Sequence, residues 1–120
     1  MPFDGTLATA LGTEQRSLAT ALGGQELVRA RLRFARNQIA AGRWCQRYEH
    51  DDDGNRCLIG WAQGAELPQI GMCAIVHLWR ALPKSAQHCS APMRTDLARY
   101  NDTHTRNAVI KLLDRAIETT

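Results

Sequence analysis

The feature that most constrains this chain is an apolar stripe at helical spacing within residues 25–41, with glycine on both sides. The stripe consists of Val28, Leu32, Ala35 and Ile39. Intervals of four, three and four residues place these side chains on one face of an α-helix. Leu27 and Phe34 should widen that face, and Gly42 stands where helices commonly end. The sequence therefore predicts a helix that packs along one side.

Further helices are predicted downstream, separated by proline and glycine. We expect a short helix over 57–65, and a longer one from about residue 69 to Leu82, between Pro68 and Pro83. The longer helix is apolar on most sides, which is typical of a central, buried helix. A short helix over 93–100 and a last one ending near Glu118 follow, with Thr103 or Asp102 as N-cap. The expected fold is all-α, an irregular bundle of about five or six helices with a small hairpin or loop near residues 44–57.

The chain of 120 residues has the length of one domain. Its first segment repeats Leu-Ala-Thr-Ala-Leu-Gly at residues 7–12 and 18–23. We expect residues 1–24 to form an N-terminal arm or short helices, around 3–11 and 14–22, and residues 25–120 to form a helical domain. A flexible extension is the alternative for the arm, because both copies are only weakly apolar.

Composition narrows the class of protein. The net charge is +3, carried by 13 Arg and two Lys, which is milder than most nucleic-acid-binding domains show. The longest apolar run is too short to span a bilayer, and the N-terminus lacks the basic region of a secretory signal. We therefore expect a cytoplasmic protein whose four cysteines are free thiols, since the cytosol keeps thiols reduced.

Several short motifs then occur in an order that resembles a known family. The motifs are, in order, Trp44-Cys45, an acidic Asp-Gly turn, Cys57-Leu58-Ile59-Gly60, Tyr100-Asn101-Asp102, Arg106 and a helix over 109–117. This order is similar to a family of small bacterial and phage proteins known only as a domain of unknown function, over about residues 27–117. The chain departs from its pattern at Trp61, usually Ala, and at Asn107, usually Thr. The resemblance implies a shared helical fold and supplies no activity or cofactor.

The residues of these motifs also suggest structural roles. Gly60 should permit close helix packing, because a side chain there would push a neighbouring helix away. Asn101 and Asp102 should bond free backbone N–H groups at the start of the last helix.

A cluster of aromatic and arginine residues is the candidate binding site. It consists of Arg43, Trp44, Arg47, Tyr48, Arg56 and Trp61. Trp, Tyr and Arg are the residue types that most often anchor protein interfaces. The competing interpretation is that the aromatic rings close the core while arginines cover their faces.

Two other function classes stay open. A basic helix face would suit a nucleic-acid-binding regulator; it consists of Arg29, Arg33 and Arg36. A small cysteine-dependent enzyme would need a base beside the thiol. The candidate pairs are Cys57 with His50 and, buried on one helix face, Cys73 with His77. No metal or cofactor is expected, because the His, Cys and Asp residues lack ligand spacing.

The sequence thus predicts a small non-enzymatic helical protein that binds a protein partner. The resemblance adds the expectation of a phage or mobile-element origin, and in such a setting we expect an accessory or inhibitor protein.

Overall fold

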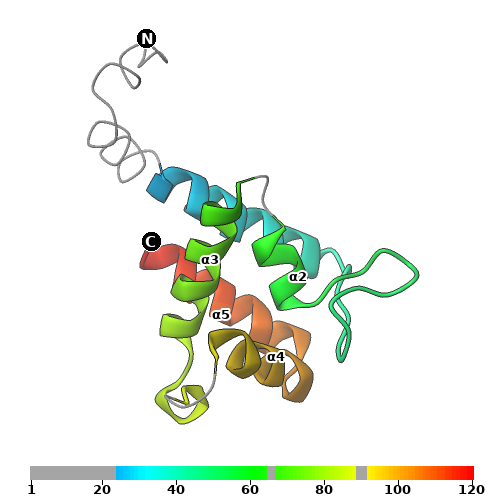
Figure 1. The fold of residues 1–120 in the computed structure, drawn as a ribbon. Coiled ribbons are helices and arrows are strands. Elements are labelled where there is room, and N and C mark those ends of the chain that lie inside the picture. The colour runs from blue at the N-terminus through cyan, green and yellow to red at the C-terminus, as the bar shows by residue number, and fades with distance from the viewer. Residues whose placement is uncertain (1–23, 65–66, 89–91) are drawn as a thin grey trace, which may run out of the picture.

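The fold is an irregular all-α bundle, as predicted, seen in a computed structural model that describes residues 24–64, 67–88 and 92–120. A helix over 24–40 comes first. The following elements are α2 (Leu58–Gln63), α3 (Pro68–Ala81), a short 3-10 turn (Lys84–Ala86), α4 (Met93–Thr103) and α5 (Arg106–Glu118) (Figure 1). The predicted N-terminal arm and its helices around 3–11 and 14–22 lie outside the described residues.

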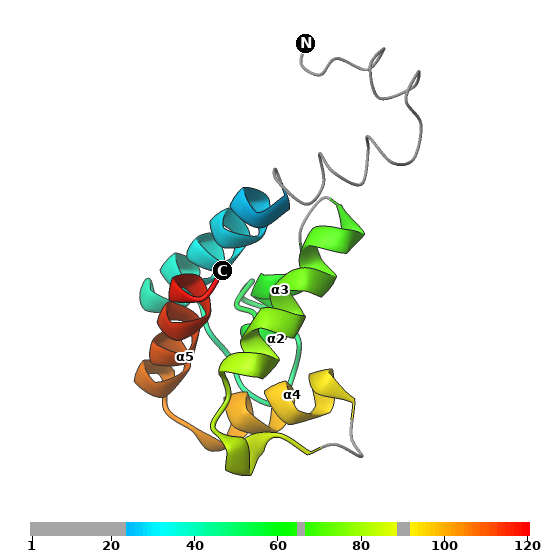
Figure 2. The ribbon, with the colours of Figure 1, turned by 90° about the vertical axis from the view of Figure 1, so that its left-hand side faces the viewer.

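The 24–40 helix and α5 lie side by side and run in opposite directions, as both ribbon views show (Figures 1 and 2). Arg36 of the first helix bonds Asp114 of α5 with 3.1 Å between Nε and Oδ1. Helix α3 packs against α2, α4 and α5, so it lies at the centre of these helices. The long loop between the 24–40 helix and α2 stands at one end of the molecule (Figure 1).

The predicted stripe on the first helix forms part of the core. Its members are at most 3% exposed: Val28, Leu32, Ala35 and Ile39. The expectation that Leu27 and Phe34 widen the buried face is wrong, since they are 50% and 43% exposed. Each precedes a stripe residue by one position, a rotation of about 100° that turns it off the buried face. Phe34 instead packs edge-on against Trp61, with 5.9 Å between ring centroids.

The bounds of α3 agree with the prediction, but its burial does not. Ile70, Ala74 and Leu78 are buried, whereas Met72 is 61% exposed and Cys73 is also exposed. The exposed side chains of Met72 and Cys73 show that one face of α3 is open to solvent. The prediction that Cys73 is buried with His77 is therefore wrong.

The first helix ends at Gly42 as predicted, whereas α5 begins at a residue other than the predicted caps. Gly42 has φ +90°, and Arg43 N donates to Gln38 O at 3.1 Å, which closes the first helix with a Schellman motif. The predicted caps of α5 are wrong, because Asp102 and Thr103 lie inside α4. Thr105 is the N-cap, and its hydroxyl accepts from Ala108 N at 3.2 Å.

Candidate functional site

The candidate site is built on the segment from residue 43 to 57, here called the 43–57 loop. Its two ends run beside each other: Arg56 N donates to Arg43 O at 3.2 Å, and Cys45 N donates to Arg56 O at 3.3 Å. Cys57 N donates to Glu49 O at 3.0 Å. These bonds form only isolated bridges, so the segment is a folded loop rather than a regular hairpin.

The tip of the loop is closed by the side chain of Asp51. Its Oδ1 accepts from the backbone N–H groups of Asp53 and Asn55, at 2.9 Å each, and Gly54 has φ +85°. The predicted Asp-Gly turn is therefore present. A hydrogen bond from the Asn55 side chain, more than any other contact, lowers the pKa of Asp51. The Asp51 carboxylate therefore stays ionised at neutral pH.

Asn101 on α4 holds the base of the loop. Its side chain is fully buried, and its Oδ1 accepts from Trp44 Nε1 at 2.6 Å and from Leu58 N at 3.0 Å. Its Nδ2 donates to Cys45 O at 3.1 Å. The expected role of Asn101 in capping α5 is wrong, because its hydrogen bonds go to the loop. One amide thus joins the start of the loop to the start of α2.

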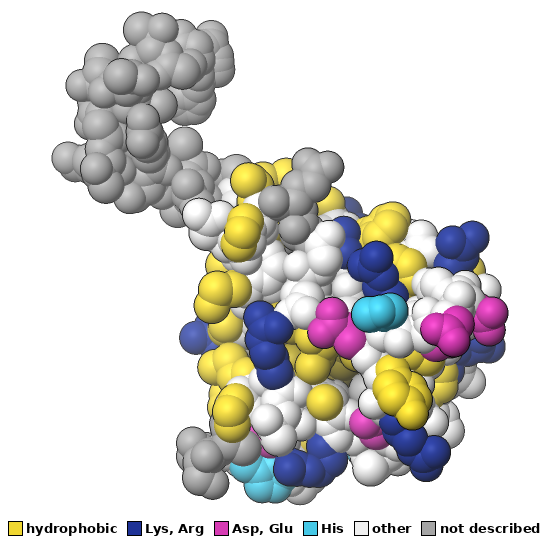
Figure 3. Space-filling model, turned by 45° about the vertical axis from the view of Figure 1, so that its right-hand side comes forward, with side chains coloured by type: hydrophobic (Ala, Val, Ile, Leu, Met, Phe, Trp, Pro, Cys, Tyr) yellow, Lys and Arg dark blue, Asp and Glu magenta, His cyan; other side chains and the backbone are white. Residues whose placement is uncertain are grey.

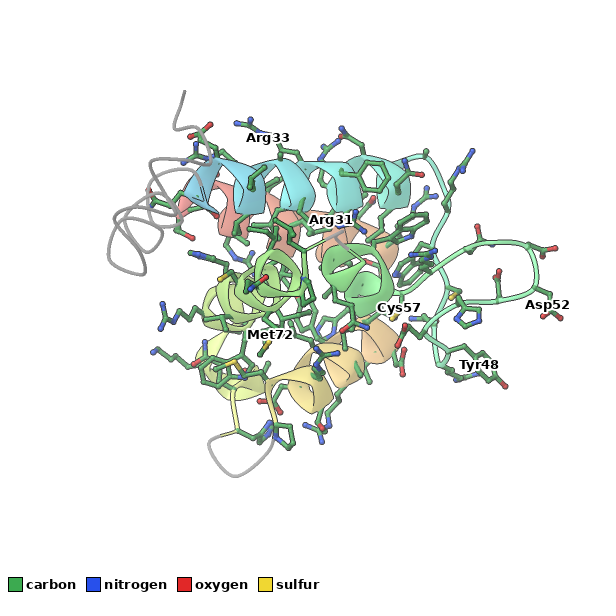
Figure 4. The ribbon with its side chains drawn as sticks, turned by 45° about the horizontal axis from the view of Figure 1, so that its top comes forward. Arg31, Arg33, Tyr48, Asp52, Cys57 and Met72 are labelled. Carbon is green, nitrogen blue, oxygen red and sulfur yellow. The ribbon has the colours of Figure 1, made fainter. Side chains whose placement is uncertain are left out.

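The neighbouring residues fix the next turn of the loop. Asp102 Oδ1 accepts from Arg47 N at 2.7 Å, and Gln46 Nε2 donates to Asn101 O at 3.0 Å. Arg47 has φ +75°, a conformation that non-glycine residues rarely adopt. Tyr48 follows directly and is 70% exposed. Figure 4 shows its ring on the outer side of the loop, away from the bundle. The loop therefore presents the aromatic side chain of Tyr48 on a backbone that hydrogen bonds to Asn101 and Asp102 hold in place.

The structure divides the six candidate binding residues into two groups. Trp61 is 7% exposed and donates from Nε1 to Arg43 O at 2.7 Å, while Trp44 is half-buried on Asn101. Both indoles close the interior, as the competing interpretation held. The members that face solvent are Arg43, Arg47, Tyr48 and Arg56.

Gly60 packs against the loop rather than against a helix, contrary to its expected role. A Cβ atom at Gly60 would lie 2.6 Å from Glu49 O and 2.9 Å from Arg56 Cβ. The glycine thus allows the loop to lie directly on α2.

A pocket of about 180 Å³ opens between the loop and α4. Its lining residues are Arg47, Tyr48, Glu49, Cys57, Ile59, Ala98 and Asp102. Most of the exposed lining is apolar, and charged groups of both signs stand around it. Such a pocket suits a partner side chain with an apolar body and a polar end.

The cysteines in this region are poor nucleophiles. Burial, above all, raises the pKa of Cys57, although Gly60 N donates to its Sγ at 3.4 Å. Burial is also the main cause of the raised pKa of Cys45. Among the described residues, no hydrogen bond joins His50 to Cys57. Both thiols are therefore protonated at neutral pH, whereas catalysis requires a thiolate.

The predicted basic face is partly neutralised within the chain. Arg29 pairs with Glu26 at 2.7 Å and Arg36 with Asp114 at 3.1 Å. Arg33 is exposed and points away from the bundle (Figure 4). Figure 3 shows basic and acidic side chains interspersed on another face, rather than gathered into one basic patch.

A second polar cluster, around Asp96 on α4, was missed by the sequence analysis. Asp96 is 1% exposed and accepts from His88 N and Trp79 Nε1 at 2.8 Å each, and its other oxygen lies 2.9 Å from His88 Nδ1. These bonds, first the one from His88 N, lower the pKa of Asp96 to about 2. The partners of Asp96 lie eight and seventeen residues before it in the sequence, so no local sequence pattern predicts this cluster.

With this geometry in view, comparison with known proteins gives one match. The model of a family of unknown function, DUF6197, matches residues 24–119. The chain belongs to this family. Its model begins where the described helices begin and includes the loop, Asn101 and Asp102. No curated protein and no solved structure matches the chain. None of the helices in the described residues is long and apolar enough to cross a membrane.

Proposed function

We propose that this member of DUF6197 is a small non-enzymatic protein that binds a protein partner through the outer surface of the 43–57 loop. One observation carries the proposal: Tyr48 is 70% exposed on a loop whose backbone is held by Asn101 and Asp102. A large exposed aromatic on a fixed backbone loses little conformational entropy on binding. Tyr48 is therefore proposed as the anchor of the interface.

The pocket beside Tyr48 supports a protein rather than a nucleic acid as partner. Glu49 and Asp102 line it together with Arg47, and Asp51 closes the acidic loop tip nearby. Acidic groups repel phosphates, whereas mixed charges around an apolar centre are typical of protein interfaces. An accessory or inhibitor role is part of this proposal, and a phage or mobile-element origin is suggested by the resemblance in sequence.

Site-specific crosslinking in the host cell tests the proposal. The photoreactive residue p-benzoylphenylalanine is placed at Tyr48 and, as matched control, at Met72, which is similarly exposed on α3 far from the loop (Figure 4). We expect one discrete crosslinked protein from position 48 and not from position 72. Equal products from both positions, or none from position 48, would contradict the proposal. Purified chain that binds DNA or RNA, with an affinity that falls steeply as salt is added, would favour the nucleic-acid alternative.

A further inference from the structure

Two arginine side chains converge beside Gly64, at the C-terminal end of α2. A Cβ atom at Gly64 would lie 2.8 Å from Arg31 Nη2 and 3.0 Å from Arg56 Nη1. Arg31 comes from the 24–40 helix and Arg56 from the end of the 43–57 loop, so two distant segments bring their guanidinium groups to one point. Figure 4 shows Arg31 on the side of its helix that faces α2, while Arg33 points outward.

Each guanidinium is held in place by an aromatic ring. Arg31 Cζ lies 4.9 Å from the centroid of Phe34, and Arg56 Cζ lies 5.1 Å from the centroid of Trp61. The two rings pack edge-to-face, and Arg31 Nε donates to Trp61 O at 2.8 Å. Cation–π contacts and the hydrogen bond therefore position both cations before any ligand arrives.

The pair carries two positive charges without a counter-charge among the described residues. The ion pairs found there involve Arg29, Arg36, Arg99 and His88, and no carboxylate oxygen of a described residue lies within 4.0 Å of either guanidinium. Burial and then the charge of Arg56 lower the pKa of Arg31. Two like charges held close together are unfavourable, and a bound anion would remove that repulsion.

We propose that Arg31 and Arg56 form a binding site for a small phosphate monoester or inorganic phosphate. A dianion neutralises both cations, and guanidinium forks match the geometry of phosphate oxygens. The carbonyl oxygen of Gly60 lies 3.1 Å from the same point, and an anion avoids carbonyl oxygens at a helix C-terminus. The phosphate therefore lies on the solvent side of the two guanidinium groups. This site is separate from the pocket beside Tyr48.

The test is a titration of the ¹⁵N-labelled full chain with sodium phosphate at constant ionic strength, followed through the arginine Nε–Hε signals. We expect saturable shifts at Arg31 and Arg56 and a dissociation constant at least tenfold weaker for acetate, a monoanion. Arg56→Gln should weaken phosphate binding at least tenfold. Arg33→Gln makes the same charge change on an exposed arginine and should leave binding unchanged.

Gly64→Ala provides a variant that keeps both charges. Its Cβ atom would lie 2.8 Å from Arg31 Nη2 and 3.0 Å from Arg56 Nη1 and would push the two guanidinium groups out of their shared position, so we expect the same loss of phosphate binding as for Arg56→Gln. The Trp61 indole signal reports whether the core stays intact. Absence of saturable shifts, equal shifts at Arg33, or equal binding of acetate and phosphate would overturn the proposal. Glu66 follows Gly64 by two positions in the sequence and lies outside the described residues. Phosphate binding that appears only in Glu66→Gln would also overturn the proposal, because the arginine pair would then bind a carboxylate of the chain itself.

Discussion

Asn101 joins three separate parts of the chain through one buried side chain. Its amide bonds Trp44, Cys45 and Leu58, so the start of the 43–57 loop and the start of α2 share one anchor. A buried amide with satisfied donors and acceptors is stabilising, while its removal leaves partners unpaired. The conformation that exposes Tyr48 thus depends on a residue that is itself hidden.

Asn101→Ala should lower the free energy of unfolding by about 2–4 kcal/mol, because Trp44 Nε1 and Leu58 N lose their acceptor. Urea unfolding followed by far-ultraviolet circular dichroism measures the change. Asn107→Ala, at an exposed position of α5, is the matched control and should change stability by less than about 0.5 kcal/mol. Similar losses in both variants would contradict the proposed anchor role.

Asp96 should make stability depend on pH in the acid range. Its pKa of about 2 lies below the ordinary 3.8, so the folded state favours the ionised form. This contribution is fully present above the unfolded pKa and is lost as pH falls from about 4 to about 2.

The difference in unfolding free energy between the wild type and Asp96→Asn should accordingly shrink over that range. Urea midpoints measured at pH 7, 4, 3 and 2 test this. Asp52→Asn, on the exposed loop tip, is the control for the change of charge. A difference that stays constant with pH would show that ionised Asp96 is not what stabilises the fold.

At the scale of elements, the helices and the loop differ in how far sequence predicts them. The 24–40 helix and α3 follow from apolar periodicity and from glycine or proline at their ends, and α5 follows from its apolar periodicity; all of these are local signals. The predicted N-cap of α5, Asp102 or Thr103, is wrong because both side chains bond elsewhere. Asp102 Oδ1 accepts from Arg47 N in the loop, and Thr103 Oγ1 donates to Arg99 O within α4. No local rule predicts the distant partner of Asp102.

The contact between α2 and the loop can be tested by a substitution at Gly60, because the account predicts whether stability rises or falls. Gly→Ala inside a helix normally stabilises it by up to about 1 kcal/mol. At Gly60 the new Cβ would lie 2.6 Å from Glu49 O, so we expect destabilisation by about 1–3 kcal/mol instead. Thermal unfolding of Gly60→Ala measures it.

Gly54→Ala is the comparison for Gly60→Ala. No atom lies within 4 Å of its Cβ position, so only the positive φ of Gly54 opposes the change. We expect a smaller loss there, about 1 kcal/mol. Stabilisation by Gly60→Ala would contradict the close packing of the loop on α2.

At the scale of the whole molecule, the all-α class was predictable and the surface was not. Sequence shows the aromatic and arginine residues gathered in one segment of the chain, but it could not tell that Trp61 enters the core while Tyr48 stays outside. That division depends on the turn at Arg47, which has positive φ because Asp102 holds its backbone. The convergence of Arg31 and Arg56 likewise requires the packing of the first helix, the loop and α2.

The central claim is that Tyr48 anchors a protein partner. The most direct measurement is the dissociation constant of the purified crosslinked partner for the wild type, Tyr48→Ala and Met72→Ala. We predict that Tyr48→Ala weakens binding by about 2 kcal/mol, roughly thirtyfold, without changing the melting temperature. Met72→Ala should bind like the wild type. Equal affinity of the wild type and Tyr48→Ala would contradict the account.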